Sequence, residues 1–84
     1  MEHTLRADRL PPGAAGRIVQ LGLTGPLRRR LLELGLIPGQ TLLRRWTAPA
    51  GSPIAYEAQG MVVVLRAGDA AGILVGEVDG PWTP

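Results

Sequence analysis

The chain has 84 residues, 45% of them hydrophobic, and its formal net charge at pH 7 is +2. It has no cysteine, which excludes disulfides and thiolate metal sites, and no apolar run approaches the ~20 residues of a membrane span. The length predicts one small domain over residues 1–84 with a single core, and we expect it in the cytoplasm.

The segment before the first predicted strand offers little chemistry. Leu5 and Leu10 are its first large apolar residues, and His3 is the only histidine of the chain. A single imidazole without a cysteine or a close pair of carboxylates is a poor metal site, so we expect His3 to be an exposed terminal residue. Residues 16–21 follow as the first strand, with β-branched residues at its centre.

A short helix is predicted to begin just after Pro26, which suits a first helical position because the amide hydrogen it lacks has no partner there. Leu27, Leu31 and Leu34 follow at helical spacing, which places them on one stripe. Gly35 can adopt the left-handed conformation that ends such a helix. A helix of about eight residues is unstable alone in water, so the strands must cover its leucines.

The polar side of this helix allows two interpretations. Arg28, Arg29 and Arg30 project about 100° apart and therefore form no single flat basic patch. They also oppose the helix dipole, at a cost that either solvent or an acidic partner surface offsets. Leu32 lies about 100° from the leucine stripe, where it either covers a second part of the core or contacts a partner.

The remaining chain predicts four further strands. The strand at residues 41–47 does not alternate cleanly, which suggests a bulge. The strand at residues 61–66 is so apolar that we place it at the centre of the sheet. Five short strands with one helix inserted between the first and second predict a mainly β fold, a small five-stranded barrel. Residues 79–84 contain two prolines and are expected to form a loosely held tail. The four strands are residues 41–47, 54–58, 61–66 and 73–78.

The residues needed for catalysis are missing. The seven carboxylates are scattered, and no histidine accompanies the hydroxyl groups, so we expect no enzyme and no cofactor. Trp46, Tyr56 and Trp82 are too few aromatic residues for a polyproline groove or for stacking on single-stranded nucleic acid. The class that remains is a binding module that contacts a protein partner through apolar and arginine side chains. Nucleic-acid binding by the arginines is the alternative, and an exposed edge strand could also pair with a second copy.

The segment 31–39, Leu-Leu-Glu-Leu-Gly-Leu-Ile-Pro-Gly, resembles the leucine-leucine-x-leucine-glycine-x-x-proline-glycine core of FeoA-type ferrous-iron transport accessory proteins. Three further features are similar and occur in the same order. They are the Leu10-x-x-Gly13 segment with Ile18, the proline-bounded loop at residues 48–53, and the strand from Val62 to Arg66 ahead of Ile73-x-Val75. The resemblance covers about residues 5–78.

This resemblance implies an SH3-like barrel that acts on FeoB, the membrane ferrous-iron transporter with a GTP-hydrolysing cytoplasmic domain. Similar domains occur in iron- and manganese-dependent repressors, but this chain has no DNA-binding helix-turn-helix. No metal-ligand set is visible. As the partner-binding face we predict the helix and its flanking loop, although each of these residues could equally serve the core or the solvated surface. The candidates are Arg28, Arg29, Leu32, Leu36 and Tyr56.

Overall fold

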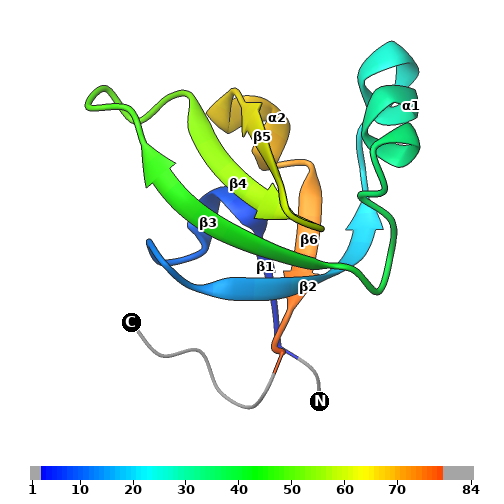
Figure 1. The fold of residues 1–84 in the computed structure, drawn as a ribbon, viewed down its shortest axis with the longest axis horizontal. Coiled ribbons are helices and arrows are strands. Elements are labelled where there is room, and N and C mark those ends of the chain that lie inside the picture. Colours follow the sequence, from blue (N-terminus) through cyan, green and yellow to red (C-terminus); the bar gives the residue numbers. More distant parts are fainter. Residues whose placement is uncertain (1–2, 79–84) are drawn as a thin grey trace.

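The computed structural model describes residues 3–78, which form a curled antiparallel sheet with its longest helix, α1, standing beside it (Figure 1). The strand order is β1-β6-β2-β3-β4-β5, so β1 and β5 are the two edges of the sheet. Residues 79–84, predicted as a loose tail, lie outside the described residues. In chain order the elements are β1 (Thr4–Arg6), the 3-10 helix η1 (Ala7–Arg9), β2 (Ala15–Leu21), α1 (Gly25–Glu33), β3 (Thr41–Thr47), β4 (Ile54–Ala58), β5 (Met61–Leu65), α2 (Ala67–Ala70) and β6 (Ile73–Gly76).

The mainly β class with a short helix inserted between two strands is confirmed, but the sheet has six strands instead of five. The five predicted strands correspond to β2 through β6. The additional strand β1 is only three residues long and has no clear alternation of its own. It forms because β6 offers it a partner, with Leu5 opposite Val75. Such a strand depends on pairing with a remote segment, which local sequence patterns do not show.

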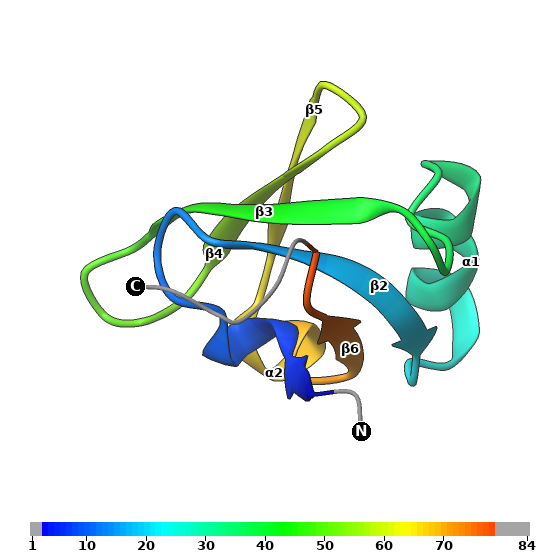
Figure 2. The same ribbon diagram turned by 90° about the horizontal axis from the view of Figure 1, so that it is seen from below.

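The core lies inside the curled sheet and is closed at the side by α1. Figure 2 shows the sheet from below, with β3 passing over β2 and with α1 standing at one end. Leu31 of α1 is buried, and Leu27 and Leu34 are half-buried against the same core, so the predicted leucine stripe is confirmed. The largest fully buried side chains come from every part of the chain: Leu10, Ile18, Leu31, Leu36, Leu42, Ile54, Tyr56, Ile73 and Val75.

A bulge in β3 explains why this strand does not alternate cleanly. The register with β4 shifts between Arg44 and Trp46, which pair with the consecutive residues Tyr56 and Ala55. The extra residue, Arg45, is therefore accommodated without a partner of its own in the ladder. The suggested bulge is confirmed: Leu42 and Arg44, at alternate positions before it, face inward, and Trp46 after it is exposed.

Two polar side chains attach η1 to the centre of the sheet. The Tyr56 hydroxyl donates to the carbonyl oxygen of Ala7 at 2.8 Å, and the Arg44 guanidinium donates to the carbonyl oxygens of Asp8 and Leu10 at 3.1 and 2.8 Å. Burial raises the pKa of Tyr56 to about 12, although the nearby Arg44 charge acts to lower it. The Tyr56 hydroxyl is therefore a neutral structural donor at physiological pH.

One further expectation is wrong. The strongly apolar β5 lies at the edge of the sheet, not at its centre, because it pairs with β4 alone. An apolar run predicts burial, but it does not specify how many neighbours a strand has. Within residues 3–78, no helix is long and apolar enough to cross a membrane.

Candidate functional site

Local sequence signals position the helix that carries the predicted docking residues. Gly25 begins α1 at φ +70°, a conformation that favours glycine, and Pro26 occupies the first turn. Gly35, at φ +94°, ends the helix. The Gly35 N–H donates to the carbonyl oxygen of Leu32 at 3.0 Å, and the Leu36 N–H donates to the carbonyl oxygen of Leu31 at 2.9 Å. This pair of bonds is a Schellman motif, a common helix ending.

The arginines of α1 are exposed, but only Arg28 lies in the first turn, the helix end that disfavours positive charge. Arg30 lies in the last turn, which favours it, so the expectation that all three arginines oppose the dipole is wrong. The first turn contains no acidic residue, and the N-cap residue Thr24 makes no side-chain capping bond. Arg28, Arg29 and Arg30 make no ion pair or side-chain hydrogen bond with any other described residue. No ion pair therefore compensates their charges in the part of the chain that the structure covers.

The helical wheel separates these arginines around α1. With Leu31 towards the core, Arg28 and Leu32 fall on one flank, Arg29 points away from the core and Arg30 falls on the other flank. Leu32 is half-buried and packs against the core, so part of its side chain remains accessible beside Arg28. Arg28, Arg29 and Leu32 are thus brought onto one outward-facing surface, which we call the α1 surface.

The structure does not place the other two predicted docking residues on that surface. Leu36 and Tyr56 are both 0% exposed, so neither can contact a partner in this fold. Leu36 is buried because the Schellman motif directs the residue after Gly35 back against the helix, where it meets Leu31. Tyr56 faces inward on β4, with its hydroxyl on the Ala7 carbonyl. The leucine-glycine-leucine pattern at residues 34–36 was a signal for the first of these burials.

Sequence reasoning missed a second surface, on the outside of strands β3, β4 and β5. Trp46 and Val64 both pair with Ala55, so the three residues form one row across the strands. Val62 lies in the next row, opposite Glu57. Trp46, Val62 and Val64 are 51%, 59% and 51% exposed, and we call these three residues the outer patch. The signal for it was the unbroken apolar run of β5, which leaves apolar side chains on both faces of an edge strand.

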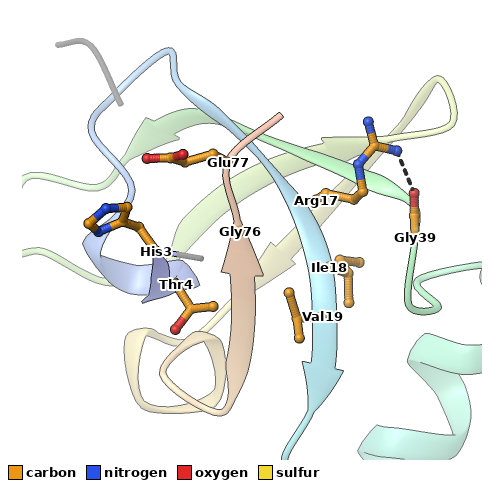
Figure 3. A pocket seen from close by; sticks show the side chains of 8 residues that line it. All are labelled: His3, Thr4, Arg17, Ile18, Val19, Gly39, Gly76 and Glu77. Atoms are coloured by element: carbon orange, nitrogen blue, oxygen red, sulfur yellow. Dashed lines mark hydrogen bonds between the residues drawn. The ribbon is translucent and has the colours of Figure 1, made fainter. Parts of the chain in front are cut away.

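A cavity of about 200 Å³ lies at the opposite end of the sheet, between β1, β6 and β2 (Figure 3). Figure 3 shows His3 and Glu77 on one side of Gly76 and Arg17 on the other, where its guanidinium donates to the Gly39 carbonyl at 3.2 Å. His3 is exposed, as expected. Among residues 3–78, no group of three or more histidine, cysteine, aspartate or glutamate side chains could hold a metal ion. The cavity is lined by one cationic, one anionic and one imidazole side chain, and Figure 3 shows that these three do not converge on a common point.

Comparisons with known proteins agree with this geometry. The model of the FeoA domain matches residues 5–77. A curated relative from Porphyromonas gingivalis, the Fe(2+) transport protein A/Fe(2+) transporter FeoB fusion protein, is 35% identical over 71 residues. That match covers 84% of this chain but only 8% of the length of the relative.

Solved structures share the fold. The FeoA protein from Chlorobium tepidum superimposes with a TM-score of 0.87 at 31% identity, over 92% of this chain and 73% of that one. The zinc complex of Stenotrophomonas maltophilia FeoA, described as a prokaryotic SH3 domain protein, gives a TM-score of 0.73 at 22% identity, over 89% and 88% of the two chains. At that identity the second likeness shows the fold alone, and it supports the SH3-like class.

Proposed function

This chain belongs to the FeoA domain family, and from that premise we propose that it is a non-enzymatic accessory protein of bacterial ferrous-iron uptake. We propose that it acts in the cytoplasm by binding the cytoplasmic part of a FeoB-type transporter. Its surface supports a binding role, because it presents exposed apolar side chains together with exposed arginines.

The observation that carries this proposal is the fusion of the two proteins in a relative. In the Porphyromonas gingivalis protein, a segment 35% identical to this chain belongs to the same polypeptide as the transporter FeoB. Covalent linkage keeps two domains at a high effective concentration. That linkage brings the two domains together in the relative, and we propose that this chain binds a FeoB-type transporter through a surface of its own.

The α1 surface is the part of the molecule that we assign to this contact. Within residues 3–78 its two arginines have no ion-pair partner, and Arg28 lies in the first turn, at the positive end of the helix dipole. An acidic surface on the transporter would offset that repulsion, and the accessible part of Leu32 would add an apolar contact. The charges orient the encounter, and the leucine supplies buried area.

The test measures binding of the tagged chain to the purified cytoplasmic part of a FeoB-type transporter at moderate salt. Arg28→Glu reverses a charge on the α1 surface, and we expect it to weaken binding by about tenfold or more, because like charges then face each other. Arg9→Glu is the matched control, since Arg9 is also an exposed arginine but belongs to η1 and not to α1. If the two variants bind the transporter with equal affinity, α1 is not part of the interface.

A pull-down from detergent-solubilised host membranes tests the partner itself. Recovery of the transporter supports the accessory role. Recovery of nucleic acid, lost steeply as salt rises, would instead identify the arginines as a phosphate-binding surface and contradict the proposal.

A further inference from the structure

Strand β5 has a free backbone edge. It pairs with β4 over five residues, and no other segment of residues 3–78 pairs with its other side. The two-residue turn between these strands fixes which backbone groups face that free side. Gln59 and Gly60 have φ values of +52° and +77°, which identify a type I′ turn and make Ala58 and Met61 a hydrogen-bonded pair.

The alternation of antiparallel pairing then assigns the outward groups. Hydrogen-bonded and non-hydrogen-bonded pairs alternate along the ladder, so Val62 and Val64 occupy non-hydrogen-bonded positions opposite Glu57 and Ala55. Their N–H and C=O groups therefore point away from β4. No backbone hydrogen bond outside the strand ladders reaches either valine within residues 3–78. The free edge presents two donors and two acceptors.

This edge also lacks the features that usually protect edge strands. The sequence Met-Val-Val-Val-Leu contains no charge, no proline and no bulge. The other edge strand, β1, is only three residues long and carries Arg6, which pairs with Asp8 at 2.9 Å. The side chains of Val62 and Val64 belong to the exposed outer patch, so of the two edge strands within residues 3–78 it is β5 that combines apolar surface with open backbone.

The position of α1 limits what can pair with the free edge of β5. In Figure 1 β5 lies between β4 and α1, and Gly35 at the end of the helix lies close to the side chain of Gln59 in the hairpin turn. A single added strand needs about 5 Å beside β5. A second copy that paired through its own β5 would also bring its β4 to about 10 Å, on the side where α1 stands. A single extended segment is therefore favoured over a second copy.

The charges on this side of the molecule indicate the chemistry of the segment. Arg66, which is exposed, directly follows β5, and the helix α1, whose three arginines are exposed, stands in Figure 1 on the side of β5 that faces away from β4. The glutamate nearest to the outer patch, Glu57, is neutralised by Arg45 at 3.0 Å. The complement is a strand with apolar residues at alternate positions and acidic residues at its flank.

We propose that the free edge of β5 receives an extended apolar and acidic segment of the partner protein as an added strand. This inference rests on the proposed function in one respect, since the segment belongs to the cytoplasmic part of the transporter. The backbone of Val62 and Val64 supplies the hydrogen bonds, and the outer patch supplies the side-chain contacts.

Amide hydrogen exchange of the wild-type chain, with and without the purified cytoplasmic part of the transporter, tests the edge directly. In the free chain the amides of Val62 and Val64 exchange quickly, because they point to solvent. On binding, both should slow by about tenfold or more. Binding that leaves both amides unprotected would overturn the inference while the proposed function stands.

Two variants test the same edge by affinity. Val64→Pro removes an outward-facing N–H, which an edge strand tolerates, and Val64→Glu places a negative charge towards the acidic segment. Each should weaken binding by about tenfold, whereas Val19→Glu, at a valine of similar exposure on β2, should not. If Val64→Pro fails to fold, the comparison of Val64→Glu with Val19→Glu and the hydrogen-exchange measurement still test the inference.

The remaining outcomes separate the two proposals. If the wild-type chain does not bind the transporter at all, the proposed function fails and this inference fails with it. If Val62 and Val64 become protected without any partner as the protein concentration rises, a second copy occupies the edge, and the assignment to a partner segment is wrong.

Discussion

Tyr56 shows how one residue can be mistaken for a contact residue when only its type and strand position are known. A tyrosine on a short strand of a binding module invites a role in recognition. In this fold its ring is fully buried, and its hydroxyl reaches the Ala7 carbonyl 49 positions away in the chain. That bond holds η1 against β4, so Tyr56 contributes to stability and not to docking.

Replacing Tyr56 with phenylalanine should destabilise the protein by about 1 kcal/mol at neutral pH, because one buried hydrogen bond is lost while the ring still fills its space. The loss stays moderate because the Ala7 carbonyl also accepts from Leu10 N–H at 3.2 Å. Urea denaturation followed by circular dichroism measures the change. Unchanged stability would show that the free energy of this hydrogen bond only offsets the cost of burying the hydroxyl. Transporter binding should be unchanged in either case.

The helix α1 combines two tasks in nine residues. Its leucine stripe must cover the core, since so short a helix does not persist alone. Its other sides carry the unpaired arginines and the partly accessible Leu32. The same element is therefore held by packing and available for binding.

A pair of truncations separates these two tasks. Leu31→Ala should cost about 2–5 kcal/mol of unfolding free energy, because it leaves a cavity at a buried position. Leu32→Ala should cost about 1 kcal/mol, because its side chain is only half-buried, and it should weaken transporter binding. Denaturant titrations and binding curves on both variants provide the comparison. Equal destabilisation by the two changes would make Leu32 a core residue and remove it from the α1 surface.

At the scale of the whole molecule, the buried Tyr56 couples global stability to alkaline pH. Its pKa is raised from 10 to about 12 in the folded state, so between these values the folded chain holds a proton that the unfolded chain releases. The resulting stabilisation is fully present below pH 10 and is lost as the pH rises through 12. It amounts to roughly 2–3 kcal/mol at most.

Unfolding free energies of wild type and Tyr56→Phe, measured at intervals from pH 9 to about 12, test this coupling. The wild-type value should fall through this range relative to that of the variant, which has no hydroxyl to ionise at this position. Parallel curves for the two proteins would contradict the raised pKa. The comparison cancels the titration of all other groups, which both chains share.

The sequence alone was sufficient for the local elements. The position of α1 followed from Pro26, the leucine stripe and Gly35, because these signals act over distances of three or four residues. Strands β2 to β6 followed from short β-branched runs between glycine and proline turns. The resemblance of residues 31–39 to FeoA proteins also agreed with the matched family model.

Tertiary structure alone decided which strands are neighbours and which side chains are covered. Strand β1 exists because β6 pairs with it, and β5 is an edge because only β4 does so. Tyr56 is buried by segments that are remote in sequence, so its type and spacing could not show it, whereas Leu36 had a local signal in the leucine-glycine-leucine pattern at residues 34–36. The physical reason is that helix and strand periodicity is set by adjacent residues, whereas strand order and burial depend on contacts that form only when distant segments meet.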